Sequence, residues 1–267
     1  MSNRLRVGAL ISGGGTNLQA VIDACESGKI SAQVVFVGSD NPEAKGLERA
    51  QKHSIPWFVA DYRKIIAGYR ASGYSLPLPN DCGMDGLLAR QSLLPKDTPA
   101  EKAKAYIASR VKAEAALLDN MSRYSFDLLI LAGFMRVLTP YFLDHVNAGQ
   151  NPPRVMNIHP ALLPSFPGTD GYGDTFRYGC KVGGCTVHFV DYGEDTGPII
   201  GQRAFAVEPD DTLDSIRKKG LEQEWLLYPA CIQLFAEKRL RITDGEPDAK
   251  GKTRRVVKIL PPKACGS

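Results

Sequence analysis

The sequence predicts an α/β fold in which a mostly parallel, twisted sheet carries helices on both faces. Short, nearly continuous apolar runs alternate with helical patterns through residues 1–160, which is typical of parallel strands buried on both sides. The final third changes character, because two neighbouring β-prone runs there are suited to antiparallel pairing. We therefore expect a Rossmann-like sheet with an antiparallel extension in the C-terminal third.

Five apolar, β-rich runs are predicted to form the parallel strands. The first is closed by three glycines and followed by a helical pattern through Leu18, Val21 and Ile22. The second precedes a predicted helix over 43–53. The five predicted strands are 7–12, 33–38, 56–60, 126–132 and 155–158.

The stretch 62–98 is rich in glycine, proline, serine and asparagine and is too long for an ordinary connection. Apolar residues at helical spacing follow it, from Ala103 to Met121. We interpret 62–98 as an insertion that leads into a crossover helix, and not as a linker between domains. A single domain over 1–267 is expected.

The C-terminal third is predicted to contain two antiparallel strands, 185–190 and 198–207, and then a long helix from about 211 to 238. Gly220 lies inside this helix and costs about 1 kcal/mol relative to alanine, so a local irregularity is compatible with the pattern. The tail 240–267 holds two β-prone pieces. An edge hairpin is favoured there over a binding tail.

Composition and charge are those of an ordinary globular protein. The 267 residues are 43% hydrophobic and 23% charged, and the net charge of +4 is too small to indicate nucleic-acid binding, although it suits an anionic small substrate. The longest apolar run, 128–135, is too short to span a bilayer, and 7–11 is too short for a signal peptide.

The six cysteines are scattered and lack the spacing of zinc ligands, so reduced thiols in a cytoplasmic protein without a metal are expected. They are Cys25, Cys82, Cys180, Cys185, Cys231 and Cys265.

Asn157 and His159 are the strongest candidates for chemistry. They lie two positions apart in Arg-Val-Met-Asn-Ile-His-Pro, and in a strand such residues face the same side. Asp195, in Tyr-Gly-Glu-Asp-Thr-Gly-Pro, can join them from another loop. Together they offer an oxyanion donor, a proton-transfer group and a charge that tunes it.

The run Ser-Gly-Gly-Gly-Thr-Asn, 12–17, lies between the first strand and the first helix. Its glycines permit close backbone approach, and the free N–H groups at a helix start favour a phosphate. It lacks the Gly-Lys-Ser/Thr of a Walker loop, and Leu18 replaces the third glycine of a dinucleotide loop. A phosphate-bearing ligand is thus favoured over a dinucleotide, with a tight turn that binds nothing as the alternative.

Four segments together resemble the glycinamide ribonucleotide (phosphoribosylglycinamide) formyltransferases, a folate-dependent family of purine biosynthesis. Asn-x-His-x-x-Leu-Leu-Pro with a later Asp-x-Gly-Pro is shared by the wider formyltransferase group, whereas Ser-Gly-Gly-Gly-Thr-Asn and Asn-Ile-His-Pro are more specific to the ribonucleotide enzymes. The segments are 11–20, 131–136, 156–164, and 186–190 together with 195–199.

The resemblance implies transfer of a formyl group from 10-formyltetrahydrofolate, the cosubstrate, to the primary amine of glycinamide ribonucleotide. The amine would attack directly through a tetrahedral intermediate, with no metal. Asn157, His159 and Asp195 would be catalytic, and Asp195 would raise the pKa of His159. The partners would be these two small molecules, with no nucleic acid or membrane, and the protein would be a monomer or homodimer.

The resemblance also implies the binding residues. Gly14, Gly15, Thr16 and Asn17 would hold the phosphate, and Glu224 would bind the ribose hydroxyls. His188 is interpreted as structural or as support for the catalytic residues. Two short segments would border the folate pocket, largely through backbone groups: Met135, Arg136, Val137 and Leu138, and Tyr192, Gly193 and Glu194.

Three features depart from the family pattern. The 62–98 segment is longer than expected. Residues 169–174, in the atypical loop 169–183, replace a histidine-containing segment and leave 175–178 as the remnant of a helix. Leu221 stands where a phosphate-directed lysine is expected, with Lys218 or Lys219 as substitutes.

Because these departures fall around the acceptor, other assignments stay open. They are a sugar-nucleotide N-formyltransferase, a formyltetrahydrofolate hydrolase, and a phosphate-ligand binding protein without catalysis. A methionyl-tRNA formyltransferase is disfavoured, because the tail after Arg239 is short for a basic C-terminal domain.

Overall fold

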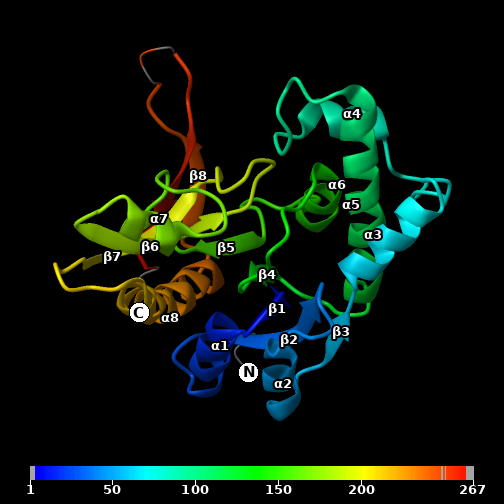
Figure 1. The fold of residues 1–267 in the computed structure, drawn as a ribbon. Helices are drawn as coiled ribbons and strands as arrows, with labels where there is room; N and C mark the ends of the chain where they lie inside the picture. Colours follow the sequence, from blue (N-terminus) through cyan, green and yellow to red (C-terminus); the bar gives the residue numbers. More distant parts are fainter. Residues whose placement is uncertain (1–3, 248, 250, 263–267) are drawn as a thin grey trace.

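A computed structural model of the chain describes residues 4–247, 249 and 251–262. A seven-stranded sheet in the order β3-β2-β1-β4-β5-β6-β7 forms its centre, with helices on both faces (Figure 1). The predicted α/β class and antiparallel extension are confirmed. The strands are β1 Leu5–Ile11, β2 Ala32–Ser39, β3 Trp57–Val59, β4 Leu128–Leu131, β5 Val155–His159, β6 Val182–Phe189 and β7 Ile199–Ala206.

The described helices follow the predicted order with three additions, two inside 62–98 and one, Pro140–Asn147, after β4. They are α1 Thr16–Glu26, α2 Gly46–Lys52, α3 Tyr62–Ala71, α4 Met84–Arg90, α5 Ala100–Met121, α6 Pro140–Asn147, α7 Gly171–Arg177 and α8 Leu213–Ala236.

The sheet changes direction of pairing at β5. Strands β1 to β5 pair in parallel, whereas β5 pairs antiparallel with β6, and β6 with β7. The chain order also reverses at β1, which lies between β2 and β4. In open parallel sheets, ligands bind beyond the carboxyl ends of strands near such a reversal.

Alternation along the strands divides the core into two layers. On β1, Val7 and Ile11 face the layer formed with α1, α2 and α8, whereas Leu10 faces α5 and α6. All three side chains are fully buried. Figure 1 shows α3, α4, α5 and α6 grouped at the right of the molecule.

The 62–98 segment folds into α3 and α4, joined by coil. Asp61 caps α3, because its carboxylate accepts the Lys64 N–H at 3.0 Å. Leu87 of α4 packs with Ile107 and Val111 of α5 and with Tyr141 of α6. The segment is thus attached to the body by its own small apolar cluster. Its description as a family-atypical insertion stays a prediction.

Helix α8 is continuous through Gly220, without the local irregularity that the sequence allowed at this position. A Cβ at this position would lie 2.1 Å from the ring of Tyr172. Gly220 therefore admits the close approach of α7 to α8.

The helix expected over 175–178 is present, but the expectation of a loop over 169–174 is wrong, since α7 already begins at Gly171 and ends at Arg177. Glycines at 171 and 173 weaken the helical signal. The packing requires them, because a Cβ on Gly171 would lie 2.5 Å from the Pro160 carbonyl oxygen and one on Gly173 would overlap the Asp170 carboxylate.

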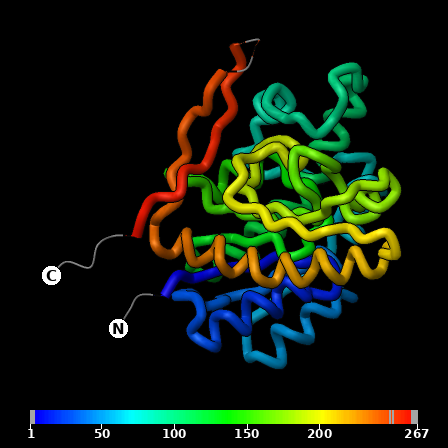
Figure 2. Tube along the Cα trace, turned by 90° about the vertical axis from the view of Figure 1, so that its left-hand side faces the viewer, coloured from blue at the N-terminus to red at the C-terminus, as the bar shows by residue number. Residues whose placement is uncertain are grey.

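The C-terminal strands β8 Leu240–Asp244 and β9 Arg255–Ile259 form the predicted hairpin, which projects from the body (Figure 2). Residues 263–267 of the predicted tail, with Cys265, lie outside the described residues. The five described cysteines are free thiols. In the part of the chain that the structure describes, no helix is long and apolar enough to cross a membrane.

Candidate active site

The end of β5 presents two polar side chains, Asn157 and His159. Asn157 lies opposite His188 of β6, and His159 lies opposite Thr186. Both histidines are only 2% exposed. The turn from parallel to antiparallel pairing therefore places a second histidine directly beside the predicted pair.

Asp195, in the loop between β6 and β7, joins both histidines. Its Oδ2 lies 3.2 Å from Nδ1 of His159, and its Oδ1 lies 3.6 Å from Nε2 of His188. The Gly168 N–H donates to Oδ2 at 2.9 Å. The structure thus brings the three predicted catalytic residues together.

The backbone of Asp195 has a φ of 53°, which lies in the left-handed region that a residue with a side chain seldom adopts. Such conformations persist where the surroundings impose them. Here the bonds from His159, His188 and Gly168 hold the carboxylate in place.

His188, which the sequence indicated as structural or as support for the catalytic residues, lies beside Asn157 and Asp195. Its Nδ1–H donates to the Phe189 carbonyl at 2.9 Å. Its Nε2 lies 3.3 Å from the Asn157 amide nitrogen and 3.6 Å from Oδ1 of Asp195. His188 therefore contacts two of the three predicted catalytic residues. The strand register is the signal for the contact with Asn157, and alternation within β6 alone does not reveal it.

Both ring nitrogens of His159 face oxygen acceptors. Nε2 donates to the Phe166 carbonyl at 2.8 Å, and Nδ1 faces Asp195, so a doubly protonated ring satisfies both. Burial opposes that charge and leaves the pKa of His159 lowered, although Asp195 and the Phe166 carbonyl act in the opposite direction. Asp195 therefore raises this pKa as predicted, but desolvation outweighs the carboxylate, and the net pKa lies below its usual value.

Asp195 shows the opposite balance. Burial raises its pKa, but the hydrogen bonds from His188 and Gly168 and the charge of His159 lower it more, and the net pKa lies below the usual value. An ionised Asp195 beside an easily deprotonated imidazole is an arrangement that can move a proton.

A cavity of about 240 Å³ opens in front of these residues. Its wall includes six of the seven residues predicted to border folate, whereas the Tyr192 ring turns away and its hydroxyl donates to Asp144 at 2.5 Å. The six are Met135, Arg136, Val137, Leu138, Gly193 and Glu194.

Two contacts fix the segment around Met135 and Arg136. The Met135 N–H donates to the Ser12 hydroxyl at 2.8 Å, and Arg136 Nε lies 2.5 Å from the buried Asp40 carboxylate. One wall of the cavity is thus attached to the ends of β1 and β2.

Glu224 reaches the cavity from α8 and is 4% exposed. The Asn17 amide donates to its Oε2 at 2.5 Å, and the Tyr172 hydroxyl donates to its Oε1 at 2.6 Å. Burial raises the pKa of Glu224 against these two bonds. Tyr172 was not predicted, because only the unexpected course of α7 brings it here.

The glycine loop keeps an open face at the start of α1. Gly14 and Thr16 are exposed, whereas Gly15 is buried with a φ of 68°. A Cβ on Gly15 would lie 2.9 Å from the Gly46 backbone. The loop is therefore pressed against α2 while the N–H groups of α1 start beside it.

The side chain of Asn17 binds Glu224 and does not point out as a separate phosphate donor. Of the two lysines suggested as substitutes for Leu221, Lys219 is paired with Asp211 at 2.6 Å. Among the described residues, no group of three or more histidine, cysteine, aspartate or glutamate side chains is arranged to hold a metal ion.

Comparison with known proteins gives a consistent result. The family described as "Formyl transferase" matches residues 5–232. Phosphoribosylglycinamide formyltransferase of Haemophilus influenzae is 33% identical over 92% of this chain and 94% of its own length, and that of Escherichia coli is 34% identical over 90% and 92%.

A solved structure of glycinamide ribonucleotide transformylase 1 from Symbiobacterium toebii superposes with a TM-score of 0.72 at 35% identity. The match covers 98% of this chain and 96% of that one.

Proposed function

The chain belongs to the formyl transferase family, and on that premise we propose that it transfers the formyl group of 10-formyltetrahydrofolate to the primary amine of glycinamide ribonucleotide. This reaction is a step of purine biosynthesis. The observation that carries the proposal is the meeting of Asn157, His159 and Asp195 at one cavity, whose wall includes the segment 135–138. Relatives of nearly equal length have this activity in their names.

The chemistry needs an oxyanion site and a path for one proton. The amine nitrogen forms a bond to the formyl carbon, and the carbonyl electron pair moves onto oxygen. The Asn157 amide and a protonated His159 stabilise that oxygen, and a single donor of this kind is worth ~10²–10³ in rate. Collapse breaks the bond to N10 of the folate, which takes up a proton as the amine loses one.

Asp195 serves the proton path. It lies 3.2 Å from His159 and is ionised near neutral pH because its pKa is lowered. It therefore favours the protonated imidazole when the oxyanion forms and accepts the ammonium proton, directly or through water. Positioned acid–base groups contribute about 10²–10⁴ in rate.

The acceptor lies along α1 and α8 in this proposal. Its phosphate binds the N–H groups of Gly15 and Thr16 at the start of α1. Its ribose hydroxyls bind Glu224, which Asn17 and Tyr172 hold in one orientation. A carboxylate has about four acceptor positions, so both internal bonds leave room for substrate hydroxyls.

The folate lies along backbone groups of 135–138 and 193–194, in the cavity that these segments line. We expect two small-molecule substrates and no nucleic acid, and a cytoplasmic monomer or homodimer.

The test follows absorbance of a 10-formylfolate analogue with a panel of acceptors. Release of deformylated folate with glycinamide ribonucleotide is expected, and His159→Ala should reduce it by ~10²–10³. Turnover only with an amino sugar nucleotide would indicate a sugar-nucleotide N-formyltransferase. Turnover without any acceptor would indicate a hydrolase, and ribonucleotide binding without turnover a binding protein.

A further inference from the structure

We propose that the 62–98 segment sets the position of the loop that carries Asp195, with Arg90 and Ser92 as positioning residues. This inference deepens the proposed function and rests on it. The loop is residues 190–198, between β6 and β7. It supplies Asp195 and two residues of the cavity wall, Gly193 and Glu194.

Ser92 makes the first contact. Its hydroxyl donates to the Tyr192 carbonyl at 2.9 Å, across 100 positions of sequence. The coil after α4 therefore holds the loop by its backbone, three residues before Asp195. A bond to a backbone atom restrains the course of the chain whatever the side chain at that position.

Arg90, the last residue of α4, makes the second contact. Its Nη1 lies 2.7 Å from Oδ2 of Asp144 on α6, and Oδ1 of Asp144 accepts the Tyr192 hydroxyl at 2.5 Å. The guanidinium carbon also lies 5.7 Å from the centre of the Tyr192 ring. The three side chains form one closed network, which is worth more than an isolated surface pair.

Tyr192 is thereby fixed at both its carbonyl and its hydroxyl. On the other side the loop is braced internally, since Oδ1 of Asp191 accepts the Gly193 N–H at 3.1 Å and the Thr196 hydroxyl at 2.6 Å. Because Asp195 sits in a left-handed conformation, a shift of the preceding turn would move its carboxylate relative to His159.

The base of this support is itself anchored. Leu87 packs against α5 and α6, and Nε2 of His145 on α6 lies 2.8 Å from the Asp81 carboxylate. The segment can therefore transmit a fixed position from α5 and α6 to the loop. A separate bond, from Lys112 of α5 to the Pro77 carbonyl at 2.7 Å, lies on the outer side of the segment and is not part of this support.

Two variants test the contacts separately. Ser92→Ala removes the bond to the Tyr192 carbonyl, and Arg90→Gln removes the charge beside Asp144. Each variant is expected to lower kcat and to raise the KM for folate. In each variant the two changes together should lower kcat/KM about fivefold, which corresponds to the loss of one ordinary hydrogen bond. The KM for the ribonucleotide should stay the same, since Asn17 and Glu224 lie on α1 and α8. Ser92→Thr keeps the hydroxyl and should restore the wild-type values.

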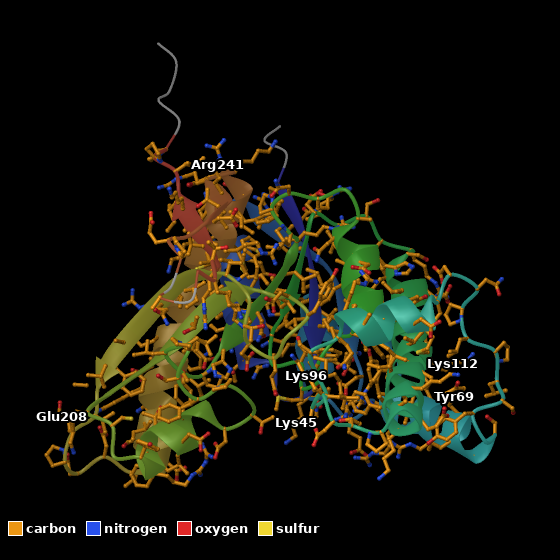
Figure 3. All side chains as sticks on the ribbon, turned by 90° about the horizontal axis from the view of Figure 1, so that it is seen from above. Lys45, Tyr69, Lys96, Lys112, Glu208 and Arg241 are labelled. Carbon is orange, nitrogen blue, oxygen red and sulfur yellow. The ribbon has the colours of Figure 1, made fainter. Side chains whose placement is uncertain are left out.

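Amide hydrogen exchange of residues 190–198 provides a readout apart from activity. Both variants should speed exchange in this loop. Lys112→Gln is the matched control, because it also cuts a bond between the segment and the body, but on the outer side where Lys112 and Tyr69 lie (Figure 3). It should leave the exchange of 190–198 and the kinetics unchanged.

If Ser92→Ala and Arg90→Gln matched Lys112→Gln in both kinetics and exchange, the positioning role would be overturned. A wild-type protein without formyl transfer would instead overturn the proposed function. The exchange experiment would still report whether the segment restrains the loop, so the two failures are distinguishable.

Discussion

A single carboxylate, that of Asp195, binds two buried histidines and a backbone N–H at the carboxyl end of β5. This crowding explains the electrostatics of the site. His159 loses basicity by burial and regains part of it from Asp195. The acid–base balance of the site is therefore sensitive to one side chain.

Asp195→Asn should lower formyl transfer by about 10²–10⁴, since a positioned charged group is lost. It should also lower the pKa of His159 further, because the carboxylate that favours the imidazolium is gone. Turnover assays and NMR titration of the His159 ring measure the two effects. Asp214→Asn, at a carboxylate 96% exposed, is the control. An unchanged His159 titration in Asp195→Asn would contradict this account.

Gly220→Ala should weaken acceptor binding through Tyr172. The new Cβ would lie 2.1 Å from the Tyr172 ring, so the ring must move and its hydroxyl leaves Glu224. A rise of the ribonucleotide KM by about fivefold is expected for one lost hydrogen bond, with the folate KM unchanged. Tyr172→Phe removes the hydroxyl without moving the ring and should give the same rise. A normal KM in both variants would show that Glu224 needs no such support.

The meeting of Asn157, His159 and Asp195 at one cavity could be predicted, because a motif carries each residue and alternation places Asn157 and His159 on one face. His188 and Tyr172 could not be placed in the same way. Their contacts depend on the β5–β6 register and on the course of α7, and both are tertiary facts with no local sequence signal.

A buried carboxyl joins α5 to the start of α6. Oε1 of Glu114 accepts the Thr139 N–H at 2.7 Å, Oε2 accepts the Thr139 hydroxyl at 2.5 Å, and Thr139 is the residue that precedes α6. Glu114 is 0% exposed. Burial raises its pKa to about 7, although both Thr139 bonds lower it.

Glu114 should make stability depend on pH. Because its pKa is raised from 4.5 to about 7, its contribution is fully present below the unfolded pKa and is lost as the pH rises through the folded one. Glu114→Gln can keep both Thr139 bonds without a charge. At pH 8 the free energy of unfolding of this variant should therefore exceed that of the wild type by up to about 3 kcal/mol. At pH 4 the two free energies should differ little. Urea unfolding at both pH values measures this, and an equal difference at both would contradict it.

The predicted strands and the long helices α1, α5 and α8 agree with the structure to within a few residues, because long apolar patterns fix them. Helix α7 was missed for a physical reason. Its glycines are required because a Cβ would clash with Pro160 or Asp170. In the sequence pattern, the same glycines indicate a loop.

The candidate site and the C-terminal hairpin lie in separate parts of the protein. None of the described hairpin residues lines the active-site cavity, and Figures 1 and 2 show the hairpin projecting away from the sheet. It meets the body through Leu240, which is 5% exposed, and through the partly buried Ile242 and Val257, which pack against the main core.

A chain ending at Asp244, without β9, should keep both KM values and kcat. It should lose roughly 1–3 kcal/mol of stability, because the bonds between Arg239 and Leu260 and the partly buried Val257 are removed. Chemical unfolding and steady-state kinetics of the shortened chain test this. A large loss of kcat at a temperature where the chain stays folded would connect the hairpin to the site.

The antiparallel pairing of β5 with β6 also makes the candidate active site intolerant of insertions within β5. Asn157 and His159 pair directly with His188 and Thr186 of β6, so their side chains lie on the same face of the sheet. Inserting one residue in β5 before Asn157 would turn both side chains toward the opposite layer of the core. The same insertion at 148–151, in the coil before β5, would be absorbed. Among natural relatives, insertions and deletions should therefore occur in the coil before residue 155 and be absent from β5.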